Sequence, residues 1–73
     1  MTYQAVIERA DDGTVFAYVP DFPGCTSAGA TVEQAQRNVS EAARLWVEAA
    51  REGGDAVPRP TTIGSVAIEV SAA

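Results

Sequence analysis

Histidine and lysine are both absent from this chain, and cysteine occurs only once. Without histidine there is no Ser-His or Cys-His nucleophilic pair, no imidazole general base and no copy of the commonest metal ligand. Without lysine, Schiff-base and Ser-Lys chemistry are excluded as well. A single cysteine forms no internal disulfide, and no histidine or cysteine cluster can hold a structural metal. What remains for catalysis is carboxylates, so the sequence favours binding over enzymatic activity and predicts no cofactor.

The carboxylates could in principle converge on a divalent metal, as two-metal nucleases require. The candidates are Glu8, Asp11, Asp12, Asp21 and Glu69. A hairpin turn explains Asp11 and Asp12, and solvent-facing strand positions explain Glu8 and Glu69. The sequence therefore predicts no metal site.

Ten acidic residues stand against five arginines, which gives a net charge of -5. Such a chain gains nothing from the release of phosphate counterions, so nucleic acid is not expected as a direct partner. A basic protein fits this charge better. The start of the sequence has no basic leader, and no apolar run approaches the roughly 18 residues of a membrane span, so we expect a cytoplasmic protein that does not contact a membrane.

The length predicts one domain over residues 1–73 with a marginal core. A chain this short buries only about 60% of the surface that its unfolded form exposes. No disulfide or metal compensates for this. We therefore expect self-association, as a dimer or tetramer.

Alternating polarity predicts four strands in the order β-β-β-α-β. Residues 3–10 and 14–19 should form an antiparallel hairpin around the turn sequence Asp-Asp-Gly at 11–13, whose residues tolerate positive φ. A short third strand, 25–28, follows a turn with two prolines. After the helix and a proline-stiffened connector, residues 65–70 should form the last strand.

The second predicted strand is apolar on both faces. Val15, Ala17 and Val19 lie on one face, and Phe16 and Tyr18 lie on the other. One helix can cover only one face of a sheet. Phe16 and Tyr18 are then either partly exposed aromatics of a small domain or part of a contact surface, and we favour the contact surface because exposed apolar patches tend to mark interaction sites.

One helix is predicted, starting at Val32. Thr31 is a suitable N-cap, and Gln34 stands three residues on, at the spacing of a capping box. Gly53 and Gly54 should end the helix. An apolar stripe runs along one side: Val32, Ala35, Val39, Ala42, Ala43, Trp46, Val47 and Ala50. Trp46 is expected in the core, with a subunit interface as the alternative.

Two further features have both a chemical and a structural interpretation. Cys25 could be a reactive thiol, but no neighbour in sequence lowers its pKa, so a buried structural thiol is favoured. The segment 29–31 at the helix start could bind an anion. It lacks the glycines and the lysine of a phosphate loop, so capping is the better explanation.

The stretch from Tyr3 to Ala50 resembles the HicB-like antitoxin domain. The resemblance is carried by VPDFPGC at 19–25, by GATVEQA at 29–35 and by the alanine-rich helix that follows. It implies an α+β fold with a single-layer βββαβ sheet, one helix packed on one face, and a partial likeness to ribonuclease H. It also implies a role in neutralising a small basic HicA-type toxin that degrades mRNA. Fuller members carry a C-terminal DNA-binding segment, and this sequence resembles a short member without it.

We therefore predict a protein-binding module without chemistry of its own. The residues expected to contact the toxin are Phe16, Tyr18, Asp21 and Phe22, with Glu8 and Glu69 steering by charge. One alternative is a stand-alone homo-oligomeric structural or regulatory module without a toxin partner. Another is a residual ribonuclease H-like nuclease that depends on a metal.

Overall fold

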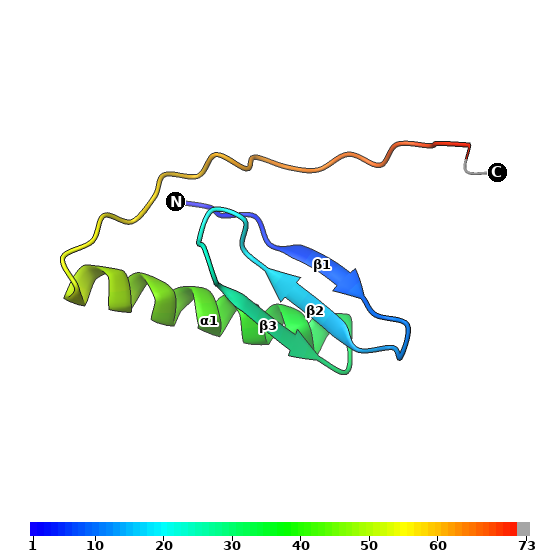
Figure 1. Ribbon diagram of the computed structural model, residues 1–73, viewed down its shortest axis with the longest axis horizontal. Coiled ribbons are helices and arrows are strands. Elements are labelled where there is room, and N and C mark those ends of the chain that lie inside the picture. Colours follow the sequence, from blue (N-terminus) through cyan, green and yellow to red (C-terminus); the bar gives the residue numbers. More distant parts are fainter. Residues whose placement is uncertain (72–73) are drawn as a thin grey trace.

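The computed structural model describes residues 1–71, so the last two residues of the chain lie outside the described part. It contains strands β1 (Val6–Arg9), β2 (Val15–Tyr18) and β3 (Thr26–Gly29), followed by helix α1 (Val32–Glu52). The strands form one antiparallel sheet in the order β1-β2-β3, and α1 covers one of its faces (Figure 1). The predicted α+β arrangement, a single sheet with one helix packed on it, is confirmed.

The turn between β1 and β2 forms as its residue types predict. Gly13 adopts a φ of 91°, which a residue with a Cβ rarely adopts. Asp12 Oδ1 accepts the backbone N–H of Thr14 at 2.9 Å. The hydrogen bond from Ala10 N to Thr14 O, 2.8 Å long, closes the hairpin. The carboxylate and the glycine together therefore set the register of β1 on β2.

Two consecutive β-turns connect β2 to β3. In the first, the N–H of Phe22 donates to the Val19 carbonyl at 3.1 Å, and in the second the N–H of Cys25 donates to the Phe22 carbonyl at 3.0 Å. Proline precedes Gly24 in the second turn, and Gly24 has a φ of 80°, as a type II turn requires. This double turn buries Phe22 and leaves Asp21 at the surface.

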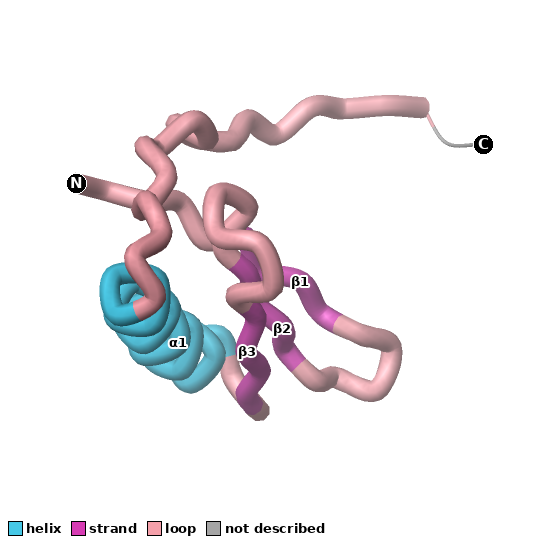
Figure 2. The backbone as a smooth tube through the Cα atoms, turned by 60° about the vertical axis from the view of Figure 1, so that its left-hand side comes forward, coloured by secondary structure: helices cyan, strands magenta, loops and turns pink. Residues whose placement is uncertain are grey.

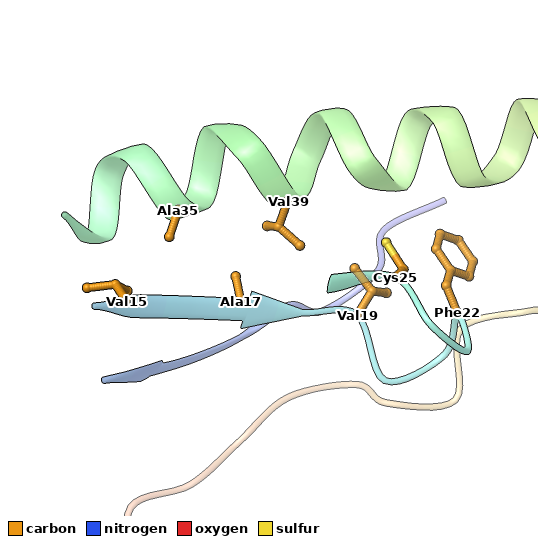
Figure 3. Close-up of a cluster of buried hydrophobic side chains, with 7 residues drawn as sticks. All are labelled: Val15, Ala17, Val19, Phe22, Cys25, Ala35 and Val39. Carbon is orange, nitrogen blue, oxygen red and sulfur yellow. The ribbon is translucent and has the colours of Figure 1, made fainter. Parts of the chain in front are cut away.

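The core lies between β2 and α1 and extends to the double turn (Figure 3). Alternate residues of β2 point toward the helix, while Phe16 and Tyr18 between them point to the other side. The predicted division of the two faces of this strand is thus confirmed. The buried cluster consists of Val15, Ala17, Val19, Phe22, Cys25, Ala35 and Val39.

An aromatic stack extends the core at the double turn. The ring of Phe22 lies parallel to that of Trp46, with centroids 4.4 Å apart and an interplanar angle of 5°. Tyr3 packs against Phe22 at the same centroid distance, with a tilt of 46°. Trp46 Nε1 donates to the Pro23 carbonyl at 3.0 Å, so its polar atom has a partner. The expected core position of Trp46 is confirmed.

Both ends of α1 are capped by the predicted residues. Thr31 Oγ1 accepts the N–H of Gln34 at 3.1 Å, while Gln34 Oε1 accepts the N–H of Ala30 at 2.6 Å. At the other end Gly54 takes a φ of 76°, and the N–H of Asp55 donates to the Ala50 carbonyl at 2.8 Å. This is the hydrogen-bond pattern of a Schellman motif.

The predicted last strand, Ser65–Val70, does not form in this structure. After the helix the chain runs back along the body, where the Tyr3 hydroxyl donates to the Pro58 carbonyl. Residues 63–71, the C-terminal arm, then extend away from the sheet (Figure 2). Val66, Ile68 and Val70, the alternate apolar residues of this predicted strand, are 85%, 76% and 73% exposed. The prediction of this strand is wrong for the single chain, because the arm leaves the body before it reaches a sheet edge.

Gly29 is where the sheet comes closest to the helix. A Cβ built at this position would lie 2.7 Å from the backbone nitrogen of Ala35 and 3.0 Å from the Gln34 carbonyl carbon. Backbone atoms of a capped helix cannot move aside easily. The absence of a side chain here therefore allows α1 to pack on β3.

We predict that Gly29→Ala lowers the free energy of unfolding by about 1–3 kcal/mol, the usual cost of overpacking. Urea denaturation followed by far-UV circular dichroism measures the change. Gly64→Ala is the matched control, because a Cβ there meets nothing within 4 Å, and it should leave the midpoint unchanged. Equal stability of the two variants would contradict the close packing at Gly29.

Candidate partner-binding surface

The face of the sheet opposite α1 carries the exposed aromatic residues. Residues that oppose each other across a ladder share a face, so the pairing of Phe16 with Glu8 and Ala28 places all three there. Phe16 lies on the central strand and is 45% exposed. Tyr18 is partly buried beside it. The whole open face consists of Val6, Glu8, Phe16, Tyr18, Thr26 and Ala28.

Acidic side chains lie beside the open face at the end near the β1–β2 hairpin turn. Glu8 is exposed and stands directly beside Phe16. Asp11 and Asp12 lie in the hairpin turn that joins the same two strands. The hydrogen bond from the backbone N–H of Thr14 lowers the pKa of Asp12, because it favours the charged carboxylate. An apolar aromatic centre with acids at its margin suits a basic protein surface better than an anionic ligand.

Phe22 does not belong to this surface. It is only 2% exposed and lies between Tyr3 and Trp46 in the core. Its expected role in direct contact has to be corrected to a structural one. In the sequence a phenylalanine between two prolines is compatible with either position, and only the turn geometry decides between them.

Asp21 binds the connector that follows the helix. Its Oδ1 accepts the Thr61 hydroxyl at 2.7 Å, and its Oδ2 accepts the Thr61 N–H at 3.0 Å. The N–H and hydroxyl of Thr62 also donate to this carboxylate, at 3.3 and 3.2 Å. The Thr61 hydroxyl, followed by the backbone N–H groups of Thr61 and Thr62, lowers the pKa of Asp21. Asp21 therefore anchors the base of the C-terminal arm, a role that no local sequence pattern indicated.

The structure brings only part of the predicted set together. Glu8, Phe16 and Tyr18 share the open face. Asp21 lies in the double turn, and Glu69 is exposed on the C-terminal arm. Steering by Glu69 remains a prediction.

The chemical alternatives concern the carboxylates, Cys25 and the start of the helix. Over residues 1–71 no three acidic, histidine or cysteine side chains come together in a way that could hold a metal ion. Cys25 is buried, and burial raises the pKa of its thiol, as expected for a structural cysteine. The helix start is occupied by its own caps.

The described residues also contain no helix of the length and apolarity needed to cross a membrane.

A groove lies where the N-terminal segment meets α1. It is a shallow, wide-open groove of about 440 Å³ with Phe22 and Val47 among its lining residues and Arg44 and Arg51 at the helix side. Arg44 forms ion pairs with Glu41 and Glu48 along the helix. Part of the basic charge at the groove is therefore paired within the chain.

Residues 3–71 match the family model described as the HicB-like antitoxin of bacterial toxin-antitoxin systems. The chain is 34% identical over 59 residues to a UPF0150 protein of Thermoplasma acidophilum, and the aligned stretch covers 81% of this chain and 86% of that protein. It is 45% identical over 47 residues to a UPF0150 protein of Helicobacter pylori, with 64% of each chain covered. It is also 40% identical over 63 residues to an uncharacterised 14.9 kDa protein from the rep-hol intergenic region of Haemophilus phage HP1. That match covers 86% of this chain but 47% of the phage protein, so the chain spans about half its length.

We predict that Asp21→Ala releases the connector without unfolding the core. Amide hydrogen exchange at Thr61 and Thr62 should accelerate by about tenfold or more, because both N–H groups lose their acceptor. The amide of Ala17, in the buried ladder, should keep its protection. Asp11→Ala, in the exposed hairpin turn, is the matched control and should leave all three amides unchanged.

Acidification should release the same anchor. The pKa of Asp21 is lowered in the folded chain, so the anchor stabilises the fold above the usual pKa of aspartate and is lost as the pH falls through the lowered value. The NMR signals of the Thr61 and Thr62 amides should therefore shift only below the usual titration range of aspartate. In Asp21→Asn this transition should disappear. A transition retained in that variant would show that another group controls the connector.

Proposed function

The chain belongs to the HicB-like antitoxin family, and on that premise we propose that it neutralises a small basic HicA-type, mRNA-degrading toxin by direct contact. The proposed agent is one protein-binding domain, residues 1–73, that acts in the cytoplasm and performs no chemistry itself. It covers the catalytic or RNA-binding surface of the toxin. Nucleic acid is not a direct partner of the chain in this proposal.

The observation that carries the proposal is the exposed aromatic centre of the open sheet face. Aromatic side chains dominate the binding energy of protein interfaces, especially where surrounding residues exclude water from them. Phe16 stands on the central strand with Tyr18 two residues on, so both are held by a rigid ladder on each side. A partner that lies on this face would bury Phe16 with little loss of conformational entropy.

Charge supports the same kind of partner. The net charge of -5 attracts a basic protein and speeds association with it. Glu8 beside Phe16 supplies an acidic contact at the margin of the face, and Glu69 on the C-terminal arm adds long-range attraction. A toxin that binds RNA has to present a basic surface, and an acidic antitoxin competes for that surface.

We also propose that the chain acts as a homo-oligomer, either a dimer or a tetramer. The buried cluster contains only small and medium apolar side chains besides Phe22. Meanwhile Ile63, Val66, Ile68 and Val70 are largely exposed along the C-terminal arm. A second copy that covers these side chains would add the apolar burial that the small core lacks.

We predict that Phe16→Ala weakens toxin binding by about 2 kcal/mol, or roughly 30-fold in Kd, the cost typical of an interface hot spot. The probe is a purified small basic HicA-type toxin, with affinity measured by isothermal titration calorimetry. RNA cleavage by that protein should be inhibited by the native chain and much less by the variant. Because Phe16 is exposed, circular dichroism should show an unchanged fold.

Leu45→Ala provides the matched control. Leu45 is 50% exposed, close to the exposure of Phe16, but it lies on α1 and away from the open face. Its removal should change neither affinity nor inhibition. If Leu45→Ala weakens binding while Phe16→Ala does not, the toxin contacts the helix and the proposed surface is wrong. If the native chain and the basic protein fail to bind at all, the antitoxin role itself is refuted.

A further inference from the structure

The outer edge of β1 presents unpaired backbone groups. The hydrogen bond from Ala10 N to Thr14 O shows that Ala10 directs its backbone groups toward β2. In an antiparallel ladder successive residues direct these groups to alternate sides, so Glu8 also bonds inward. Ile7 and Arg9 then direct their N–H and C=O groups outward. This edge is a template on which another extended segment can pair.

The opposite edge of the sheet is partly closed by the helix. The N–H of Val19 donates to the Cys25 carbonyl, so Cys25 directs its backbone groups toward β2. By the same alternation, Ala28 directs its backbone groups outward from β3. Asn38 Nδ2 on α1 donates to the Ala28 carbonyl at 2.7 Å and so occupies an acceptor on that edge. An incoming strand finds fewer free groups there. Of the two edges, β1 is the accessible one.

The C-terminal arm has the character of a strand without a neighbour. Its sequence alternates, with Val66, Ile68 and Val70 on one side of an extended backbone. All three are exposed, and the arm forms no hydrogen bond with the body beyond Thr62 in the described part of the chain. Asp21 binds Thr61 and Thr62, just before the arm begins. This contact fixes the point at which the arm leaves the sheet of its own chain.

We propose that the C-terminal arm of one copy pairs with the outer edge of β1 in a second copy, so that two chains exchange arms. This inference rests on the self-association proposed above and specifies its surface. Each chain has one arm and one open edge. In a dimer with two-fold symmetry, the arm of each chain pairs with the open edge of the other, so both arms and both edges are paired. The fourth strand that the sequence predicts is then supplied by the partner.

The apolar side chains at both surfaces favour this pairing. Ile7 on β1 is 39% exposed, because α1 lies mainly over β3 and β2 and covers β1 least. A strand added beside β1 with Val66, Ile68 and Val70 on the helix side would cover Ile7 and extend the core outward. The exchange therefore satisfies the backbone groups of the edge and buries the exposed side chains of the arm at once.

Two variants test the exchange. One disrupts the arm and the other disrupts the edge of β1. Ile68→Asp places a charge on the apolar side of the arm. Arg9→Pro removes an outward N–H from the edge and leaves the inward ladder to β2 intact. We expect the native chain to be a dimer, or a tetramer built from exchanged dimers, by sedimentation velocity. We expect each variant alone to dissociate with a Kd raised by about tenfold or more.

A mixture of the two variants is decisive. Ile68→Asp retains a native edge and Arg9→Pro retains a native arm, so an equimolar mixture should recover association through one intact contact per pair. An arm that folds back on its own sheet would show no such recovery. Ala67→Asp, on the other side of the arm, and Arg9→Thr, which keeps the N–H, should both associate like the native chain.

A monomeric native chain, or a mixture that associates no better than its components, would overturn the exchange. The outcome is independent of the toxin, which is absent from these measurements. Phe16→Ala should still associate like the native chain, so loss of toxin binding and loss of arm exchange remain distinguishable.

Discussion

The stacking of Phe22 between Tyr3 and Trp46 joins three parts of the chain that no strand pairing connects. Tyr3 belongs to the N-terminal segment, Phe22 to the double turn and Trp46 to the helix. The bond from Trp46 to the Pro23 carbonyl fixes the turn against the helix, and the hydroxyl of Tyr3 holds the connector. Because Phe22 points inward, its neighbour Asp21 points outward and meets Thr61. The double turn therefore contacts the core through Phe22 and the base of the arm through Asp21.

A second constraint is that a single helix can cover only one face of a sheet. The core uses the face on which β2 places its smaller side chains, and the aromatic side chains of β2 remain on the other face. The helix also lies toward β3, where Gly29 lets it approach and Asn38 reaches the strand edge. What is left open is a face with Phe16 at its centre and the outer edge of β1. The face suits a basic partner, and the edge suits an extended segment.

Local patterns predicted the elements of the fold well. The alternation of β2 assigned each residue to the correct face, and the hairpin formed around Asp12 and Gly13. The capping residues Thr31 and Gln34 placed the start of the helix, because a cap involves only neighbours along the chain. The candidate surface was found in part, since Phe16 and Tyr18 follow from strand alternation alone. The fourth strand was not found in the single chain, because a strand needs a neighbour as well as a suitable pattern.

The sequence by itself determined the three strands, the helix with its caps and the apolar character of both faces of β2, since each depends on contacts between residues close in the chain. Only the tertiary structure decided that Phe22 is buried, that Asp21 anchors Thr61, and that the C-terminal arm leaves its own sheet. Those outcomes depend on contacts between residues far apart in the chain, such as Asp21 with Thr61. Local periodicity carries no information about such distant pairs, because the packing of the whole chain determines which of them meet.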